Sequence, residues 1–365
     1  MAPPTTQPIM EGQQIRVLDL FSGAGGLTAG LHRASDRFRT VRAVEVDKAA
    51  AASYRANHGD TVYVGKIETW LQEDEVPTVD LLVGGPPCQG FSTLGKQNAE
   101  DGRNTLWQKY AETMVRAEPK YFIVENVASF LSSIQFRQFV TATARDGSLS
   151  DYTFEAKVLN AADFGSAQAR KRAVLIGHHR DLPFPGWPQP SHTSKHRTVR
   201  DVLGGVPSGW RSLDLPERLV VVDGKQFPGP FTTTELHVGR RYSPLSLQRF
   251  SRIPPGGNRF NLPEELLCDA WRKHKTGSAD VMGRLHWDKP SVTIRTEFHK
   301  PEKGRYLHPV ANRALTHYEA ALLQGFDPDY LWVGSKTAIA KQIGNAVPIP
   351  LGTALGKLLV RQLQH

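Results

Sequence analysis

Short apolar runs alternate with helical patterns over the first 180 residues of the chain. Short apolar runs of this kind indicate buried strands, and their alternation with helices indicates a parallel sheet covered on both sides. Two further runs, 154–161 and 172–179, predict additional edge strands. We therefore predict an α/β fold for this part, with strands at 15–21, 40–46, 79–85 and 121–127 and helices at 47–58 and 104–117.

The texture of the sequence changes after Arg180. The stretch DLPFPGWPQP is rich in residues that interrupt regular structure, and residues 181–312 contain 15 of the 25 prolines but no long helical pattern. We predict a smaller, loop-rich domain in this segment. Helical patterns return at 315–326 and in the closing stretch IPLGTALGKLLVRQLQH.

The positive charge of the chain is concentrated in the same segment. The formal net charge is +9. Residues 181–312 hold 20 Lys and Arg against 13 Asp and Glu, which gives an excess of +7 there and +2 elsewhere. Charge alone leaves two interpretations open, a solubilising surface and a module that faces a polyanion.

Other bulk features restrict the class of protein. No run approaches the roughly 18 apolar residues of a membrane span. The opening MAPPTTQPIMEGQQ lacks a basic region followed by an apolar one, which argues against a signal peptide and predicts a short disordered lead-in. The only two cysteines are Cys88 and Cys268, which argues against a disulfide framework and for a reducing, cytoplasmic setting.

A glycine-rich stretch, DLFSGAGGLTAG at 19–30, follows the first predicted strand and opens a helix. Glycines here permit a tight turn and the close approach of a ligand to the backbone. Glu45 ends the second strand 20 residues after Gly25, a spacing that suits a carboxylate bound to ribose hydroxyls. The pattern is compatible with NAD, FAD or S-adenosylmethionine, and also with a turn that binds nothing.

Three reactive side chains are predicted at one edge of the sheet. Cys88 follows the third strand in GGPPCQGFS, where two prolines stiffen the backbone, and Glu125 lies near the end of the next strand. In QARKR, alternate residues of an extended segment would place Gln168, Arg170 and Arg172 on one face. Each has a structural alternative: a buried small residue for Cys88, a helix cap for Glu125 and a solvated edge for QARKR.

Taken together, these motifs resemble those of the bacterial-type cytosine-5 DNA methyltransferases, of the restriction-modification or orphan kind. The matching stretches occur in the order DLFSGAGG, VEVD, GGPPCQGFS, ENV, QARKR, RALTHYEAALLQGF and QIGNAVP. They cover most of the chain outside 181–280. The resemblance implies a Rossmann-like S-adenosylmethionine-dependent methyltransferase domain with a smaller, loop-rich target-recognition domain.

The same resemblance implies the reaction. The enzyme would transfer a methyl group from S-adenosyl-L-methionine to carbon 5 of a flipped-out cytosine in a specific duplex DNA sequence, leaving S-adenosyl-L-homocysteine and using no metal. The Cys88 thiolate would add to carbon 6 and so make carbon 5 nucleophilic. Glu125 would hydrogen-bond the exocyclic amine and N3, while Arg172, with Arg170 nearby, would bind the carbonyl oxygen.

Further residues carry over by position. The expected cofactor-binding residues are Asp19, Phe21, Gly23, Gly26, Glu45, Ile67, Pro87, Leu106, Asn345 and Val347. One departure concerns Lys66, which stands where many relatives have an Asp that accepts a hydrogen bond from the adenine amine. A lysine cannot accept that bond, so Glu68 or a backbone carbonyl would have to replace it.

The DNA-contacting residues are expected in the motifs and in the basic segment. Thr293 lies where relatives place a threonine beside the phosphate of the flipped base, and SRIPPGGNRF at 251–260 is either a groove-entering loop or a structural turn. Arg295 and Arg305 are further candidates for phosphate contacts. The expected DNA-contacting set is Gln89, Ser92, Gln168, Arg252, Arg259 and Thr293.

The resemblance also divides the chain and suggests its partners. The predicted parts are a disordered lead-in (1–14), a catalytic and cofactor-binding domain (15–180), a target-recognition domain (181–312), a hinge and connecting helix (313–341) and a segment returning to the catalytic domain (342–365). We expect a cytoplasmic, nucleoid-associated monomer that binds double-stranded DNA and no membrane, beside a cognate restriction endonuclease that acts separately. The alternatives are a tRNA cytosine-5 methyltransferase and a catalytically idle DNA-binding regulator. PCQGFS in place of PCQPFT argues against the first, and the intact catalytic set argues against the second.

Overall fold

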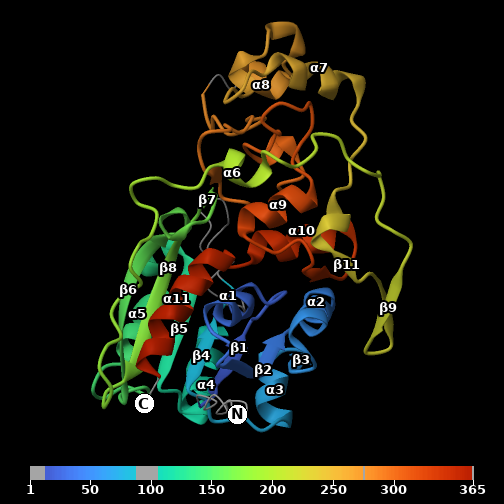
Figure 1. The fold of residues 1–365 in the computed structure, drawn as a ribbon. Coiled ribbons are helices and arrows are strands. Elements are labelled where there is room, and N and C mark those ends of the chain that lie inside the picture. The colour runs from blue at the N-terminus through green and yellow to red at the C-terminus, as the bar shows by residue number, and fades with distance from the viewer. Residues whose placement is uncertain (1–12, 88–105, 274–275, 364–365) are drawn as a thin grey trace, which may run out of the picture.

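The centre of the molecule is a seven-stranded sheet (Figure 1). The computed structural model describes residues 13–87, 106–273 and 276–363. The strand order is β3-β2-β1-β4-β5-β8-β6. Neighbours within the first five strands are parallel, whereas β8 runs antiparallel to both β5 and β6. The strands are β1 (Ile15–Leu20), β2 (Phe38–Glu45), β3 (Val62–Val64), β4 (Leu81–Gly84), β5 (Tyr121–Val127), β6 (Tyr152–Asn160) and β8 (Lys171–His179).

Helices cover both faces of this sheet because its strands are apolar on both sides. In β1, Leu18 and Leu20 join a core with residues of α3, α4 and α5, whereas Val17 joins the opposite core with α1 and α11. The covering helices are α1 (Gly26–Ala34), α3 (Ile67–Glu73), α4 (Leu106–Ala117), α5 (Ile134–Ala142) and α11 (Ile349–Gln362), while α2 (Lys48–His58) packs beside β2 and β3.

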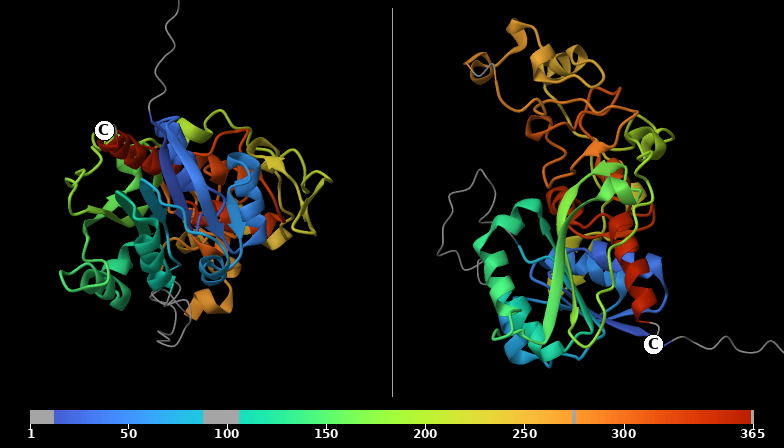
Figure 2. Two further views of the ribbon diagram at one scale, coloured as in Figure 1. Left: turned by 90° about the horizontal axis from the view of Figure 1, so that it is seen from below. Right: turned by 90° about the vertical axis from the view of Figure 1, so that its left-hand side faces the viewer.

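The last helix returns to the first. Helix α11 lies against α1, where Gly30 and Gly352 face each other so closely that a side chain on Gly30 would overlap the backbone of Gly352. Figure 2 shows α11, in red, alongside the sheet lobe. The end of the chain therefore completes one face of the domain that the beginning of the chain forms.

The elements from α6 to α10 form a second lobe above the sheet (Figures 1 and 2). Its strands are short and paired two by two, and its longest helices have nine and ten residues. Its elements are α6 (Val199–Leu203), β9 (Leu219–Val222), β10 (Lys225–Pro228), β11 (Phe231–Thr232), α7 (Pro244–Arg252), α8 (Asp269–Lys273), β12 (Ser291–Val292), α9 (His317–Gln324), β13 (Leu331–Trp332) and α10 (Lys336–Asn345); β12 pairs with β7 (Gln168–Ala169).

Most of the predicted elements are present, and one prediction of position is wrong. The run 172–179 was expected to form an edge strand, but β8 lies inside the sheet between β5 and β6. A strand that turns back antiparallel can insert beside β5, and the apolar run alone does not reveal this. The helices α3 and α5 were not predicted because their apolar patterns are short. The predicted lead-in lies largely outside the described residues.

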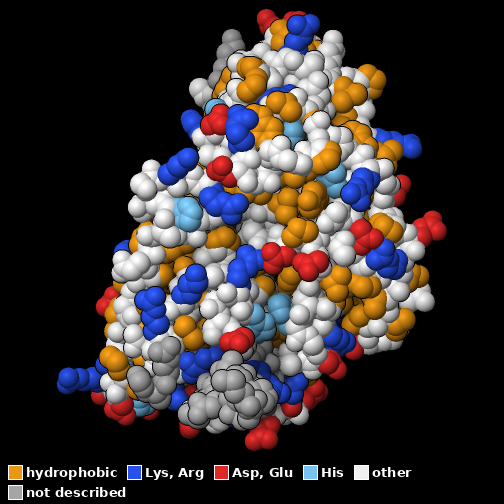
Figure 3. Space-filling view, in the orientation of Figure 1, with side chains coloured by type: hydrophobic (Ala, Val, Ile, Leu, Met, Phe, Trp, Pro, Cys, Tyr) orange, Lys and Arg blue, Asp and Glu red, His pale blue; other side chains and the backbone are white. Residues whose placement is uncertain are grey.

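Arginine side chains hold much of the second lobe together. Arg284 is 3% exposed, and its guanidinium donates to the backbone carbonyls of Phe250, Ile253, His308 and Ala311. Arg305 donates in the same way to Gly256 and Gly257. In a segment with little regular structure, these side chains satisfy carbonyls that a helix or sheet would otherwise pair. Part of the positive charge is therefore internal, and the Lys and Arg side chains that are visible in Figure 3 are dispersed over that face.

No single described helix is long and apolar enough to cross a bilayer. Helices α10 and α11 reach that length only as a pair, and they are bent by 42° at the break between them.

Gly344, at the end of α10, provides a test of how tightly α10 packs against the segment that follows β12. A methyl group added there would lie 2.4 Å from the Thr296 backbone nitrogen, so Gly344→Ala requires the backbone to shift. We expect the free energy of unfolding, measured by urea denaturation, to fall by about 1–3 kcal/mol. Gly205→Ala is the matched control because nothing lies within 4 Å of the added carbon. Equal free energies of unfolding for the two variants would show that the backbone around Gly344 accommodates the methyl group without loss of stability.

Candidate active site

A cavity of about 1100 Å³ opens at the carboxyl ends of the parallel strands. Open α/β sheets bind ligands at this edge, because the loops that leave the strands converge there. Segments far apart in the sequence meet in its wall, including the ends of β1, β2, β4 and β5 and the segment after α10. All ten expected cofactor-binding residues line it: Asp19, Phe21, Gly23, Gly26, Glu45, Ile67, Pro87, Leu106, Asn345 and Val347.

The loop after β1 has an unusual backbone. Phe21, Gly23 and Gly25 have φ angles of 57°, 56° and 91°, all in the left-handed region. Such an angle is uncommon and costly for a residue with a bulky side chain such as Phe21, and strained residues of this kind cluster at ligand sites. Gly26 is needed for a different reason, since a side chain there would meet the Val347 carbonyl oxygen at 2.9 Å. The late segment thus packs directly on the loop.

The Glu45 carboxylate is held in place by hydrogen bonds from two backbone N–H groups. Its Oε2 accepts a hydrogen bond from the Gly23 N–H (2.8 Å), and its Oε1 accepts one from the Asp47 N–H (2.7 Å). Burial raises the pKa of Glu45, and these hydrogen bonds oppose the increase. The carboxyl group is therefore fixed in position, and each oxygen keeps a second lone pair for a ligand hydroxyl.

Glu125 and Arg172 form an ion pair in the cavity, with Arg172 Nε 2.9 Å from Glu125 Oε1. They come from the neighbouring strands β5 and β8, and their side chains are only 10% and 13% exposed. The position of β8 inside the sheet is what brings them together. A carboxylate and a guanidinium can hydrogen-bond adjacent polar atoms of one flat ring.

Asn126 is a residue that the sequence reasoning did not single out. Its side-chain amide donates to the Pro86 carbonyl oxygen (3.0 Å), and its Oδ1 accepts from the Val127 N–H (2.8 Å). Asn126 therefore ties the chain just before Cys88 to the strand that carries Glu125. Its place in the ENV motif was the available signal. Cys88 itself lies outside the described residues, as do Gln89 and Ser92.

Arg170 and Gln168 lie next to the cavity but are occupied by other partners. Arg170 is buried and donates to the carbonyl oxygens of Ile294 (2.9 Å) and Gly344 (3.0 Å). Burial and the neighbouring Arg172 lower its pKa to about 9, which keeps it protonated at neutral pH. Gln168 is fully buried between Gln324 and the Ile294 N–H. These bonds position the walls of the site, and the substrate contacts predicted for Arg170 and Gln168 stay predictions.

The predicted DNA-contacting residues separate into two groups. Thr293 lines the cavity, and its hydroxyl donates to the Ala169 carbonyl (3.0 Å). Arg252 is exposed at the end of α7 and makes no hydrogen bond or ion pair with the described residues. Arg259 is 6% exposed, and its guanidinium donates to the Thr276 carbonyl and lies 4.6 Å from the centre of the Phe260 ring. Arg259 is therefore held within the lobe in this structure, and the base contact predicted for it stays a prediction.

Lys66 and Lys341 are exposed cations in the wall of the same cavity. Lys66 precedes α3 as its N-terminal cap residue but makes no side-chain capping bond, whereas Ile67 beside it is 3% exposed. Glu68, the suggested replacement acceptor, also lines the cavity.

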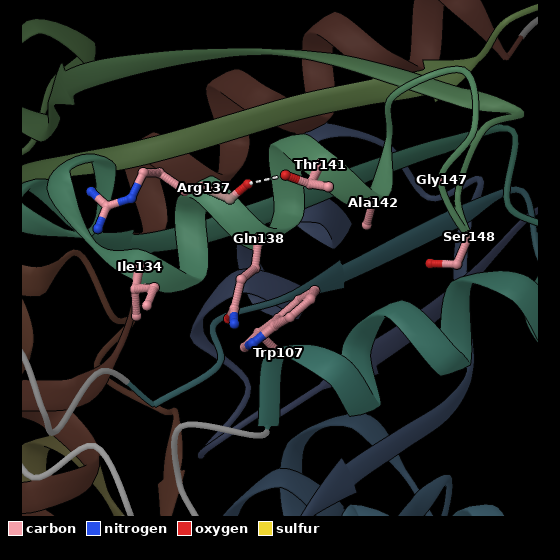
Figure 4. A pocket seen from close by; sticks show the side chains of 8 residues that line it. All are labelled: Trp107, Ile134, Arg137, Gln138, Thr141, Ala142, Gly147 and Ser148. Atoms are coloured by element: carbon pink, nitrogen blue, oxygen red, sulfur yellow. Dashed lines mark hydrogen bonds between the residues drawn. The ribbon is translucent and has the colours of Figure 1, made fainter.

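A second, shallower cavity of about 460 Å³ lies where α5 meets the start of α4 (Figure 4). Gln138 extends toward Trp107 there, and Arg137 points away from them. Its lining contains no carboxylate and none of the predicted site residues: Trp107, Ile134, Arg137, Gln138, Thr141, Ala142, Gly147 and Ser148. The larger cavity is therefore the candidate active site.

Solved structures share this fold over nearly the whole chain. An Escherichia coli prophage-encoded protein described as a DNA modification methyltransferase covers 96% of this chain and is itself covered completely, with a TM-score of 0.71 and 23% identity. The Dnmt2 methyltransferase of S. pombe covers 96% of this chain and is also covered completely, with a TM-score of 0.60 and 18% identity. At these identities the similarity concerns the fold.

The sequence comparisons are more specific. The Type II methyltransferase M1.HphI of Haemophilus parahaemolyticus is 34% identical over 353 residues, which cover 94% of this chain and 86% of that protein. The Type II methyltransferase M.XorII of Xanthomonas oryzae is 30% identical over 95% of this chain and 85% of its own length. Residues 15–361 match the family model described as C-5 cytosine-specific DNA methylase, and the chain belongs to that family.

Proposed function

We propose that this protein transfers a methyl group from S-adenosyl-L-methionine to carbon 5 of a flipped-out cytosine in a specific duplex DNA sequence, through a covalent adduct of Cys88. The family places it among the DNA (cytosine-5-)-methyltransferases and supports methylation of cytosine in DNA. The observation that supports the finer proposal is one cavity that contains the Glu125–Arg172 pair and the ten expected cofactor residues, among them Pro87, the residue before Cys88.

The cavity suits S-adenosylmethionine, which when bound supplies an electrophilic methyl group. The fixed carboxylate of Glu45 can accept hydrogen bonds from ribose hydroxyls. The loop at Gly23 leaves open space where a side chain would otherwise stand, so a ligand can approach the backbone closely. Ile67, almost fully buried at the cavity wall, offers an apolar face for adenine.

The other end of the cavity suits cytosine. Glu125 would bind the exocyclic amine and N3, and Arg172 would bind the carbonyl oxygen, so the pair recognises three edge atoms of one ring. Because both side chains are already paired and nearly buried, they need little rearrangement when the base enters. A base inside a duplex cannot reach such a cavity, so the target would have to be flipped out.

Cys88 would supply the nucleophile. Addition of its thiolate to carbon 6 forms a carbon–sulfur bond and moves electron density to carbon 5, which then takes the methyl group. Loss of the carbon 5 proton to solvent and expulsion of the thiolate restore the aromatic ring. Asn126 would be a positioning residue, because its bond to the Pro86 carbonyl sets where the Cys88 segment starts relative to Glu125.

The second lobe would bind the duplex. Its exposed cations include Arg252 and Lys273, whereas Arg259, Arg284 and Arg305 stabilise the lobe from within. The Type II relatives suggest that the protein belongs to a restriction-modification system with a separate endonuclease, and we propose that it acts as a monomer. Residues 181–312 are proposed as the recognition domain and 342–365 as a returning part of the catalytic domain.

The central test is covalent trapping. DNA that carries 5-fluorocytosine at the target should form a stable adduct with the wild-type protein, because fluorine does not leave as a proton does. Cys88→Ala should form none and should transfer no methyl groups, as measured by denaturing gel electrophoresis and by incorporation of labelled methyl. Cys268→Ala, the matched control at the only other cysteine, should keep both properties. An adduct in the Cys88 variant would rule out the proposed nucleophile.

The variant Lys66→Asp tests whether the adenine amine of the proposed cofactor needs a hydrogen-bond acceptor at this position. If the adenine amine needs an acceptor here, the variant should bind S-adenosylhomocysteine more tightly by about 1 kcal/mol, the usual net value of a hydrogen bond, as measured by calorimetry. An Asp at position 66 would also cap α3, which could by itself change the affinity. The control is therefore Lys66→Ser, because serine also caps a helix but its shorter side chain does not reach as far toward the adenine amine. An equal gain in both variants would assign the effect to capping. A loss of affinity in Lys66→Asp would show that the lysine itself contacts the cofactor.

Arg252 and Arg259 should behave differently on substitution. Arg252→Ala removes an exposed, unpaired guanidinium, so we expect weaker or less selective DNA binding with unchanged stability. Arg259→Ala removes a guanidinium that is buried in the lobe, together with its hydrogen bond to the Thr276 carbonyl, so we expect the free energy of unfolding to fall by about 1–3 kcal/mol. Urea denaturation and binding to matched and mismatched duplexes would separate the two effects. If Arg259→Ala kept full stability but lost selectivity for the matched duplex, the base contact predicted for Arg259 would be supported.

A further inference from the structure

Tyr330 is a buried side chain of the second lobe that reaches the loop after β1. It directly precedes β13 in the chain. Its hydroxyl donates a hydrogen bond to the carbonyl oxygen of Ala24, which is 306 residues away in the sequence. Ala24 is buried and lines the large cavity, whereas Tyr330 does not line it. The second lobe therefore holds this loop from behind, on the side that faces away from the cavity.

His58, at the end of α2, supports the same hydroxyl. Its Nε2 lies 3.1 Å from the hydroxyl oxygen of Tyr330. Burial raises the pKa of Tyr330 well above its ordinary value and lowers the pKa of His58 to about 3, so both side chains are neutral at pH 7. Because the hydroxyl donates its only proton to Ala24, it accepts a hydrogen bond from the Nε2–H of His58. The His58 ring also fills the space beside Gly25, where a side-chain carbon would lie 2.5 Å from Nε2.

The loop after β1 needs support of this kind because its backbone is strained. Phe21, Gly23 and Gly25 all have φ angles in the left-handed region. Strained backbone persists only where the surrounding structure holds it in place. Ala24 lies between the two glycines, and a carbonyl group that is bonded to a buried phenol cannot turn freely. The hydroxyl of Tyr330 thus fixes the peptide between Ala24 and Gly25 in one orientation.

The position of Tyr330 is itself fixed from both lobes. Within the second lobe, its carbonyl oxygen accepts hydrogen bonds from the N–H (2.8 Å) and the hydroxyl (3.2 Å) of Thr233. From the sheet lobe, the side chain of Asn57 in α2 donates to the Leu331 carbonyl (2.8 Å) and accepts from the Leu331 N–H (2.9 Å). Figure 1 shows α2, in blue, below this part of the second lobe, and α2 packs against β13. The phenol is therefore a rigid support for the loop.

We infer that Tyr330 is a positioning residue for the cofactor, because its hydroxyl keeps the loop at 21–26 in the shape that the cofactor needs. The inference rests on the proposed function, in which this loop lines the S-adenosylmethionine site. It goes beyond that function by making cofactor binding depend on a side chain of the lobe that is otherwise proposed to bind DNA. A loop that is competent in only a fraction of the molecules raises the apparent Kd by the inverse of that fraction.

Tyr330→Phe removes the hydroxyl and keeps the ring, which packs against Phe326 and Trp332. We expect the Kd values of S-adenosylmethionine and S-adenosylhomocysteine, measured by calorimetry, to rise by about tenfold, because a buried carbonyl loses its partner and the loop loosens. Both ligands should be affected equally, since they differ only in the methyl group. DNA binding by the cofactor-free variant should match wild type. Amide hydrogen exchange at residues 21–26 should be faster in the variant, and S-adenosylhomocysteine should slow it again.

Tyr121→Phe is the matched control. Tyr121 is also buried, and its hydroxyl donates to the Pro183 carbonyl oxygen at 3.3 Å. It lies at the start of β5, at the end of the strand opposite to the cavity. The control therefore loses the same kind of hydrogen bond at a distance from the loop. It should leave both Kd values and the hydrogen exchange of residues 21–26 unchanged.

The failures of this inference and of the proposed function can be told apart. If wild type binds neither ligand, the proposed function fails. If wild type binds both ligands and folded Tyr330→Phe binds them equally tightly, the positioning role is wrong and the proposed function stands. The positioning role is also wrong if the variant loses affinity for DNA and for both ligands to the same extent, because a general weakening of the fold would have that effect.

Discussion

The site depends on the guanidinium of Arg170. It binds the carbonyl oxygens of Ile294 and Gly344, which are 124 and 174 residues away in the chain. Gln168 reinforces the same junction through Ile294 and Gln324. One buried charge thus joins the sheet, the second lobe and the segment that returns to the large cavity. Because a buried guanidinium must satisfy its donors, this junction can adopt few other arrangements.

The main strands of the sheet and the residues that line the cavity could be predicted from the sequence, but the different roles of the residues within QARKR could not. Apolar runs located the main strands, and the motifs located residues that now line one wall. The alternation of QARKR predicted a shared face for Gln168, Arg170 and Arg172, yet only Arg172 pairs with Glu125. Which arginine is structural depends on carbonyl groups from distant segments, and periodicity carries no information about them. The antiparallel insertion of β8 was missed for the same reason.

The second lobe shows the limit of reasoning from charge. The excess of positive charge in 181–312 was compatible with a solubilising surface or with a module that faces a polyanion, but Arg259, Arg284 and Arg305 point into the lobe. A lobe with short helices and strands of two to four residues leaves many carbonyl groups unpaired, and arginine can bind several of them at once. Net charge therefore overestimates the cations available to DNA. The exposed and unpaired side chains, such as Arg252, give a better count.

The cavity has a different electrostatic character at each end, and this explains why some of its residues lower the stability of the fold. At one end Asp19 and Glu45 are buried carboxyl groups with raised pKa values, whereas at the other end Arg172 stands against Glu125. In the proposed reaction, a sulfonium donor and a neutral base that gains negative charge on thiolate addition would need opposite surroundings. The strained φ of Phe21 and the burial of Asp19 both lower the stability of the free protein. Ligand binding would recover part of that loss, so the free energy of unfolding should be higher in the complex than in the free protein.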